Sequence, residues 1–312
     1  MAVYTHISAE DMAGLINQYD VGKLVSAKGI AEGVQNSNYL IDTTAGRFVL
    51  TVYEQMVDSE DLPFFLALLN HLAEKNCPVP QSMPDRNGET LTRWNGKYLA
   101  LIEFLPGLSV TVPNATQARA VGDALAQMHI AVADFPMHRP NALGLDGWIE
   151  LADRCGDSLE KIACGLSARV ARECEYMSAH WPQHLPHSVI HADLFPDNVL
   201  MLGDEVGGMI DFYFACTDVR AWDIAVTHMA WSFSRDGKSY SADIGDALVA
   251  GYERRLPLSE DERTAFPILA RAACLRFLLT RAWDWLNTPA DAIVNKHDPI
   301  AMLRRLDHYS AL

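Results

Sequence analysis

The stretch "VIHADLFPDNVLMLGDEVGGMIDFYFA", residues 189–215, sets one histidine, one asparagine and five acidic residues between short apolar runs. Within it, "VLML" has the length and composition of a short strand, "GDEVGG" is typical of a turn, and "GMI" predicts a returning strand. Such a hairpin puts Asn198 and Asp211 at the two open ends of the strand pair, facing each other. The sequence therefore predicts that both polar side chains serve one site.

Asn198 and Asp211 are suited to hold one magnesium ion. Mg²⁺ is commonly held by one or two protein oxygens, while substrate phosphates and water complete its octahedron. Asp193 lies in the loop that enters the hairpin, where its carboxylate can accept a proton from an alcohol aligned with a phosphoryl group. We expect His191 to brace this loop, and Asp223, in "AWDIA", to support it through hydrogen bonds.

The order His-x-Asp-x4-Asn, followed by an apolar strand pair that ends in Asp-Phe, matches the catalytic and metal-binding segments of the kinase fold. "HADLFPDN" has alanine where protein kinases have arginine, and it resembles the small-molecule branch, the aminoglycoside and choline kinase-like phosphotransferases. The competing interpretation is an acidic surface loop whose Asp and Asn residues only cap turns. That interpretation fits Asp204 and Glu205 at the hairpin tip, but not the whole ordered set with its strands.

The N-terminal third of the chain has the pattern of a small sheet. A short helix is expected over 8–18, followed by the strands "KLVSAKGI", "SNYLIDT" and "RFVLTVYE" and by a helix over 62–75. The steps Asn87-Gly88 and Asn95-Gly96 predict hairpin turns around "ETLTRW" and "KYLALIEFL". These elements predict a mostly antiparallel sheet with one inserted helix.

After Pro106-Gly107 the chain becomes mainly helical. Apolar positions at helical spacing predict helices over 114–133, 221–234, 240–255, 260–285 and from 298 onward. The sequence therefore predicts an α+β, two-lobed protein-kinase-like fold. Its small N-lobe, residues 1–104, is an antiparallel sheet with one helix, and its larger, mainly helical C-lobe spans residues 105–312.

The loop in "KGIAEGVQNSNY" can fold over ATP and offer backbone N–H groups to its phosphates. It holds Gly29 and Gly33 but no complete G-x-G-x-x-G, so an ordinary glycine-containing hairpin explains it equally well. Ser37 adds a polar donor. Glu103 and Leu105, in "LIEFLPG" where the sheet passes into the helical lobe, are the expected contacts for the adenine.

One position departs from the kinase pattern. The third strand of a kinase N-lobe carries a lysine for the α- and β-phosphates, but "FVLTVYE" has Thr51 there. Arg47, about 13 Å away along the strand, is too far to replace it. Either Lys28 supplies the cation, or binding depends on loop amides and magnesium. A nucleotide-binding pseudokinase is the alternative explanation for the missing lysine.

Beyond the kinase motifs, "NSNY" followed by "FVLTVYE", with "HADLFPDNVL" and "RFLLTRAWDW", resembles bacterial homoserine kinases of the aminoglycoside phosphotransferase-like type over nearly the whole chain. The resemblance implies ATP-dependent phosphorylation of the γ-hydroxyl of L-homoserine, a step toward threonine. The motifs by themselves leave other acceptors open, namely choline, hydroxylysine and an aminoglycoside.

Homoserine carries a carboxylate and an ammonium group, so its site should offer an arginine or backbone amides to one end and acidic or aromatic groups to the other. Arg281, in "LLTRAWDW", and Arg276 are the candidates for the carboxylate. Either could instead belong to a structural ion pair. Tyr213 and Asn38 complete the expected acceptor contacts.

The composition describes a globular chain of 312 residues with 49% hydrophobic content, and 25 Lys plus Arg against 40 Asp plus Glu give a formal net charge of −15. This charge argues against a nucleic-acid or anionic-membrane partner, because both need a basic surface. No uncharged apolar run reaches the ~18 residues of a spanning helix, and the N-terminus lacks a secretory pattern. We therefore expect a cytoplasmic protein; its oligomeric state is left open.

The cysteines and histidines suggest structural roles. Six cysteines without a C-x-x-C pair favour reduced, mostly buried thiols. Pro182 and Pro186 prevent one helix from presenting several histidines together, which argues against a zinc site at His180, His184, His187 and His191.

Overall fold

The computed structural model describes residues 5–30, 36–54, 58–288 and 296–312. The chain forms two compact units: a first unit of residues 1–107 with 207–213, and a second unit of residues 108–206 with 214–312. The break at 107/108 lies three residues after the boundary expected from the sequence. The sequence does not predict that residues 207–213 join the first unit. They do so partly because the Met209 N–H donates to the Pro78 carbonyl (2.7 Å).

The first unit is built on a six-stranded sheet in which β1-β2-β3-β6-β4 are neighbours and β5 pairs with β6, all antiparallel. The strands are β1 Leu24–Ile30, β2 Ser37–Thr43, β3 Arg47–Tyr53, β4 Ser82–Met83, β5 Thr92–Trp94 and β6 Lys97–Glu103. The two helices are α1 Ala9–Ile16 and α2 Leu62–Glu74. The predicted strands before residue 54 and both predicted helices are confirmed.

The two Asn-Gly steps of this unit have different outcomes. Asn95 and Gly96 form the two-residue turn between β5 and β6, both with positive φ (48° and 80°), as predicted. Asn87-Gly88 also forms a turn, but β4 and β5 on either side of it both pair with β6. The hairpin predicted there is wrong, because an Asn-Gly turn sets a local bend and not the choice of strand partner.

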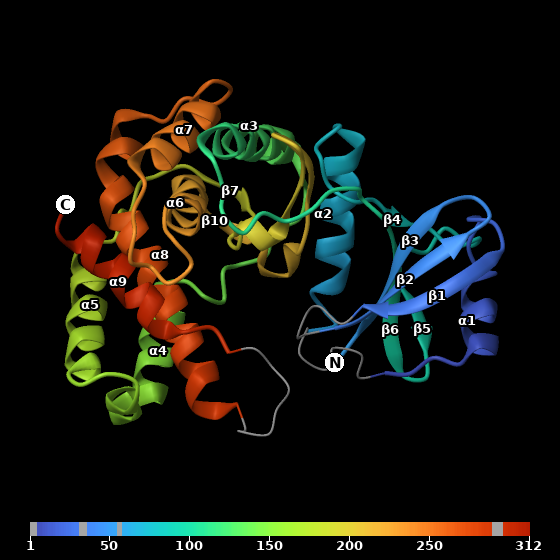
Figure 1. Ribbon diagram of the computed structural model, residues 1–312, viewed down its shortest axis with the longest axis horizontal. Coiled ribbons are helices and arrows are strands. Elements are labelled where there is room, and N and C mark those ends of the chain that lie inside the picture. Colours follow the sequence, from blue (N-terminus) through green and yellow to red (C-terminus); the bar gives the residue numbers. More distant parts are fainter. Residues whose placement is uncertain (1–4, 31–35, 55–57, 289–295) are drawn as a thin grey trace. The chain divides into compact units, whose positions relative to one another are not determined.

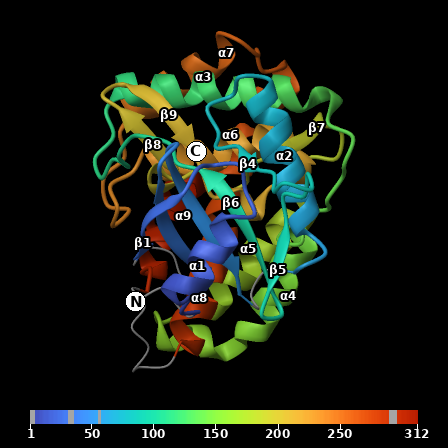
Figure 2. The ribbon, with the colours of Figure 1, turned by 90° about the vertical axis from the view of Figure 1, so that its right-hand side faces the viewer.

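The sheet has α1 on one face and α2 on the other (Figures 1 and 2). Met12, Leu15 and Ile16 of α1 pack on alternate residues of β2, β3 and β6 and form a buried apolar core. Side chains alternate between the faces of a strand. The register therefore puts Asn38 of β2 and its partner Thr51 of β3 on the face opposite α1.

The second unit is mainly helical (Figure 1). Its helices are α3 Ala115–Ala131, α4 Leu145–Cys155, α5 Leu166–His180, α6 Arg220–Trp231, α7 Ala242–Glu253, α8 Glu260–Asn287 and α9 Pro299–Ser310. The helices predicted over 114–133, 221–234, 240–255, 260–285 and from 298 are confirmed as α3, α6, α7, α8 and α9. Asn114 and Gln117 form a capping box at the start of α3.

Helices α3 and α7 approach each other closely. A Cβ at Gly122 of α3 would lie 2.0 Å from the carbonyl oxygen of Leu248 in α7. A Cβ at Gly251 of α7 would lie 2.0 Å from the carbonyl oxygen of Arg119 in α3. Glycine at both positions lets the two backbones meet.

Two short strand pairs stand beside the helices. β8, Val199–Leu202, pairs with β9, Glu205–Met209, which confirms the hairpin predicted from the sequence. Its turn is shorter than predicted, because only residues 203 and 204 separate the strands. β7, His187–Ile190, pairs with β10, Cys216–Val219. This second pair joins two four-residue strands from distant parts of the sequence, and local periodicity does not reveal it.

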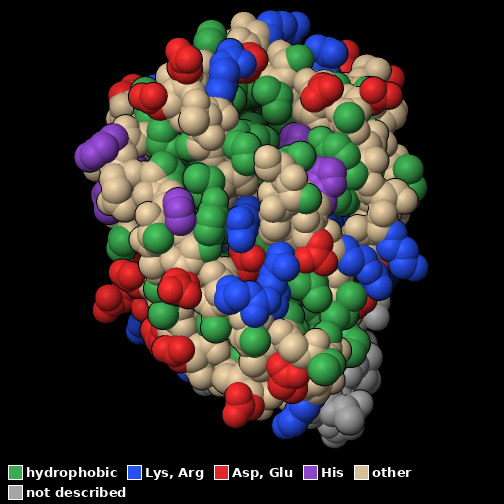
Figure 3. All heavy atoms as spheres, turned by 90° about the vertical axis from the view of Figure 1, so that its left-hand side faces the viewer, with side chains coloured by type: hydrophobic (Ala, Val, Ile, Leu, Met, Phe, Trp, Pro, Cys, Tyr) green, Lys and Arg blue, Asp and Glu red, His purple; other side chains and the backbone are tan. Residues whose placement is uncertain are grey.

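The surface and the thiols agree with a globular protein. The six cysteines are free, and Cys164 alone among them is exposed. On the face of the second unit in Figure 3, basic side chains lie beside acidic ones. Within the described ranges, no helix is both long and apolar enough to cross a membrane.

Candidate active site

The loop that carries Asp193 is fixed by one buried carboxylate. Asp223, in the first turn of α6, accepts hydrogen bonds from the backbone N–H groups of His191 (2.7 Å) and Ala192 (2.8 Å). The Asp223 carboxylate also contacts a side chain, His129 of α3, whose Nε2 lies 3.1 Å from it. The side chain of Asp223 thus does what the sequence predicted for it, whereas no motif in the sequence marks His129.

The charge of Asp223 is stabilised inside the protein. Burial by itself would raise the pKa of Asp223, but the hydrogen bond and positive charge of His129, with smaller contributions from His191, hold it below its usual value. His129 is in turn oriented by Tyr252 of α7, whose hydroxyl lies 2.8 Å from Nδ1. The Asp193 loop is therefore held by residues of three helices, α3, α6 and α7.

Arg276 of α8 supports the same loop from another side. Its guanidinium donates to the carbonyl of Ala192 (2.8 Å) and lies 3.8 Å from a carboxylate oxygen of Asp193. Burial lowers the pKa of Arg276, and the charge of Asp193 opposes that effect. The sequence named Arg276 as a candidate for the acceptor carboxylate, but its guanidinium is buried and donates to the protein backbone, so it is poorly placed for that contact.

Asn198 is hydrogen-bonded to Asp193. Its side-chain amide nitrogen donates to the backbone carbonyl of Asp193 (2.7 Å) and to its carboxylate (3.0 Å). Fixing the nitrogen leaves the amide oxygen of Asn198 free of these two contacts and able to bind a metal ion. His191 is buried, and its Nδ1 accepts the backbone N–H of Asp193 (3.3 Å), which agrees with a bracing role.

Asp211 follows strand β9 in the first unit and is exposed. Its φ of 65° lies in the left-handed region, as does that of Ala192 (63°). Non-glycine residues adopt this conformation at a cost of about 1 to 2 kcal/mol, and such strain is common at functional sites. A carboxylate and an amide oxygen are the hard ligands that Mg²⁺ prefers, so Asp211 and Asn198 fit this metal.

Thr51, at the position of the missing lysine, belongs to a buried polar row. Its hydroxyl donates to the side-chain oxygen of Asn38 (2.8 Å). The Tyr213 hydroxyl, which donates to Tyr53 (3.5 Å), is the neighbour on the other side. The Tyr213 ring packs edge-on against Tyr53 and Phe65, with centroids 5.8 and 5.7 Å away. Asn38 and Tyr213, the acceptor contacts expected from the sequence, therefore lie next to Thr51, the position at which kinases carry their phosphate-binding lysine.

Ser37 is turned away from this row. It is fully buried on the α1 face, donates to Glu54 (2.7 Å) and accepts the N–H of Thr5 (3.0 Å). Glu54 also pairs with Lys97. The Ser37 side chain is therefore on the opposite face of the sheet from Asn38 and Thr51, because residues adjacent along a strand point to opposite faces. A nucleotide contact of Ser37 stays a prediction.

The remaining nucleotide candidates lie near one end of β1. Lys28 and Gly29 are exposed in this strand, and Lys28 is paired with Leu40. This register puts Lys28 on the same face as Thr51, but two strands away across the sheet. Gly33 lies outside the described residues.

The two residues expected at the adenine differ in their backbone hydrogen bonds. The N–H of Glu103 donates to the carbonyl of Gln81 (2.8 Å) and is therefore occupied. Leu105 packs on Gly208 so closely that a Cβ at residue 208 would lie 2.5 Å from its Cδ1. Within the described ranges the Leu105 N–H has no hydrogen-bond partner, so Leu105 is the better placed of the two.

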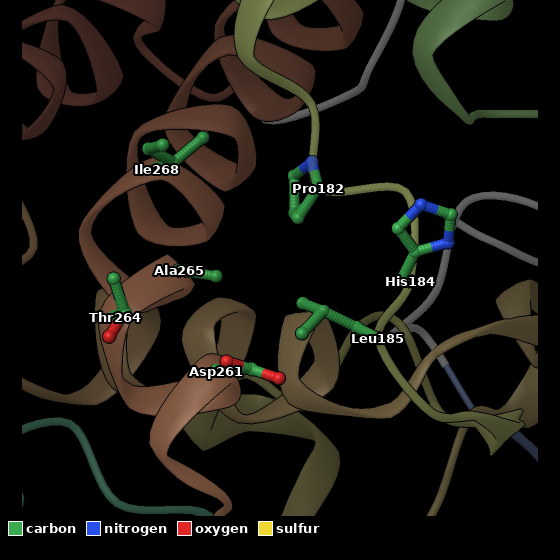
Figure 4. A pocket seen from close by; sticks show the side chains of 7 residues that line it. All are labelled: Pro182, His184, Leu185, Asp261, Thr264, Ala265 and Ile268. Carbon is green, nitrogen blue, oxygen red and sulfur yellow. The ribbon is translucent and has the colours of Figure 1, made fainter.

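The four histidines of the 180–191 segment have different surroundings. His180 stacks on Tyr176, His187 begins β7, and His191 is in the catalytic loop. His184 lines a hollow of about 290 Å³, where the 182–185 segment faces the first turns of α8 (Figure 4).

A family model described as the phosphotransferase enzyme family matches residues 26–258. The chain belongs to this family. This phosphotransferase is 49% identical to the homoserine kinase of Zymomonas mobilis subsp. mobilis over 99% of this chain and 97% of that protein. It is also 49% identical to the homoserine kinase of Agrobacterium fabrum, over 98% of this chain and 95% of that protein. The resemblance drawn from the sequence motifs is confirmed.

Solved structures show the fold of this phosphotransferase. Amicoumacin kinase hAmiN, in complex with AMP-PNP, Ca²⁺ and Ami, is similar with a TM-score of 0.74 and 13% identity, over 98% of this chain and 94% of that one. Choline kinase from Cryptosporidium parvum Iowa II is similar with a TM-score of 0.70 and 15% identity, over 97% of this chain and 95% of that one. The predicted kinase-like fold class is thereby confirmed.

Proposed function

We propose that this chain is an ATP-dependent homoserine kinase, which transfers the γ-phosphoryl group of ATP to the hydroxyl of L-homoserine. The observation that carries the proposal is the near-half identity to homoserine kinases over almost the entire chain. The geometry around Asp193 supports it, because a carboxylate held by Asn198 and Arg276 at a fixed loop is suited to accept a proton from an alcohol.

In the proposed reaction, Asp193 accepts the hydroxyl proton as the homoserine oxygen attacks the γ-phosphorus and the bond to ADP breaks. Asn198 and Asp211 would hold Mg²⁺, which neutralises phosphate charge when bound. Arg276 keeps the Asp193 backbone in place through Ala192. Positioning and charge stabilisation supply the catalysis, because no covalent enzyme intermediate is needed.

For the nucleotide, we propose that Leu105 contacts the adenine and that Gly29 and Lys28 of β1 face the phosphates. Gly29 has no side chain, so its backbone can be approached closely by a phosphate. We place this activity in the cytoplasm, where ATP and free amino acids are available.

Asp193→Asn and Asp211→Asn should each lower kcat by about 10³-fold or more, because each removes part of a site whose power comes from positioning and charge. Turnover is measured as ADP release with ATP, Mg²⁺ and L-homoserine. The matched control is Asp204→Asn in the same hairpin, where the exposed carboxylate at the turn should matter little. Near-normal turnover of a folded Asp193→Asn or Asp211→Asn protein would contradict the assigned roles.

The acceptor is identified by the same assay with L-homoserine, hydroxylysine, choline and an aminoglycoside. L-homoserine should give the highest kcat/KM. Turnover of another alcohol without turnover of homoserine would reject the substrate and keep the phosphotransferase. ATP binding without turnover of any acceptor would favour a pseudokinase.

A further inference from the structure

Among the arginines of α8, Arg281 alone makes no hydrogen bond or ion pair with the described residues. Arg271 pairs with Glu173 (2.6 Å), and Arg276 donates to Ala192 (2.8 Å). The Arg281 side chain is only partly buried. Its guanidinium donors are therefore available to an anionic group of a ligand.

Aromatic rings hold Arg281 beside the catalytic loop. Its guanidinium lies over the ring of Phe195 at 5.6 Å, and Phe195 packs edge-on against Phe277 at 4.7 Å. The backbone N–H of Phe195 donates to the carbonyl of Asp193 (2.8 Å). Arg281 follows Arg276 by five residues, or about 7.5 Å along the helix axis. The proposed base and the unpaired guanidinium thus flank one short segment of loop.

Charges of both signs act on Arg281. Burial lowers the pKa of Arg281 to about 10, the positive charge of Arg305 adds to this effect, and the carboxylates Asp193, Asp197 and Asp298 oppose it. The guanidinium therefore stays charged at neutral pH. His297 is near: its pKa is lowered first by desolvation and then by the charge of Arg281, while Asp197 opposes the shift and Arg235 adds to it.

We propose that Arg281 binds the carboxylate of the acceptor, and that this contact makes the enzyme selective for hydroxy amino acids over amino alcohols that lack a carboxylate. The inference rests on the proposed function, since it assigns a role within the same acceptor site. In homoserine, four single bonds separate the hydroxyl oxygen from the carboxylate carbon, a reach of roughly 5 Å. On this proposal, one acceptor contacts both Asp193 and Arg281, which lie on either side of Phe195 and whose charges interact. Arginine also fits a carboxylate with two parallel hydrogen bonds.

The test compares two acceptors in two variants. L-homoserine is compared with 2-aminobutane-1,4-diol, in which a neutral alcohol replaces the carboxylate. Arg281→Met should lower kcat/KM for L-homoserine about 100-fold, mainly through KM, and change kcat/KM for the diol by less than about threefold. KM for ATP should be unchanged. Arg263→Met, at an exposed position of the same helix, is the matched control and should leave both acceptors unaffected.

The outcomes separate this inference from the proposed function. Equal losses on both acceptors, or no loss on either, would overturn the role of Arg281 while homoserine kinase activity stands. If the wild-type enzyme prefers hydroxylysine and Arg281→Met reduces that turnover, homoserine is wrong and the carboxylate contact stands. A wild-type enzyme that phosphorylates only choline-type alcohols contradicts both. If no acceptor is turned over, calorimetry measures the binding of L-homoserine in the presence of ADP and Mg²⁺. The wild type must then bind L-homoserine more tightly than Arg281→Met does; equal affinities, or no binding, would overturn the role of Arg281.

Discussion

At the scale of single residues, Asp223 is the side chain on which the catalytic loop depends most. It accepts two backbone N–H groups of the loop and faces His129, all without exposure to solvent. A neutral amide of the same shape has only one acceptor oxygen and brings an NH₂ group toward these donors. A side chain of the same size is therefore not enough at this position: the two acceptor oxygens of a carboxylate are required.

Asp223→Asn should reduce the free energy of unfolding by about 3 kcal/mol, because it leaves buried donors without an acceptor. It should also lower kcat by more than 10-fold under conditions where the protein stays folded, since the Asp193 loop loses its anchor. Urea unfolding and ADP release measure the two effects. Asp246→Asn, an exposed carboxylate of α7, is the control and should change neither quantity. A stable and fully active Asp223→Asn protein would show that the loop is held by other contacts.

At the scale of elements, the pairing of β2 with β3 decides what replaces the missing lysine. Thr51 is buried between Asn38 and Tyr213, so the position is filled by a hydrogen-bonded neutral row. Tyr213 lies two residues after Asp211. The row therefore joins β3 to the segment that carries a proposed metal ligand. We infer that Thr51 acts by positioning these neighbours.

Thr51→Lys should weaken ATP binding, because a lysine must displace Tyr213 or Asn38 from a packed site and bury its own charge. We expect KM for ATP to rise about 10-fold or more. Thr51→Ser, which keeps the hydroxyl, should stay within about threefold of the wild type. ATP titration at saturating acceptor measures both variants. Tighter ATP binding by Thr51→Lys would instead reveal a real vacancy for a cation.

At the scale of the whole molecule, stability at mildly acidic pH should be limited by His228. This residue of α6 is buried, and its Nδ1 lies 2.6 Å from the Tyr309 hydroxyl of α9. Burial, with a smaller contribution from the charge of His308, lowers the pKa of His228 from 6.5 to about 4. Between these values the unfolded chain binds a proton that the folded chain does not.

The free energy of unfolding should therefore fall as the pH falls from about 6.5 to 4. Urea denaturation at several pH values, followed by tryptophan fluorescence, measures this, because every tryptophan except Trp94 lies in the second unit. His228→Gln cannot take up the proton and should show a smaller slope in this window. Asp223 does not account for the slope, because its lowered pKa affects stability only below the usual range of a carboxyl group. An unchanged slope in His228→Gln would assign the effect to another group.

The sequence by itself determined the features that depend on neighbouring residues. The strands of "SNYLIDT" and "RFVLTVYE", the helix over 62–75, the Asn95-Gly96 turn and the hairpin after Asn198 follow from local periodicity and turn chemistry. The motif around Asp193 is also local, because loop geometry fixes its spacing. Its resemblance to known kinases supplied the substrate, which no spacing of charges can specify.

Only the tertiary structure decided which distant side chains meet. The anchoring of the Asp193 loop by His129, Asp223 and Arg276 joins three helices, and the sequence predicted only the middle residue. The register of β2 separates Ser37 from Asn38, because a shift of one residue moves a side chain to the other face of a sheet. Packing likewise gave Arg276 a hydrogen bond to Ala192, whereas Arg281 makes no hydrogen bond or ion pair within the part of the chain that the structure describes. Such contacts depend on how elements far apart in the chain come together, and no local pattern encodes that.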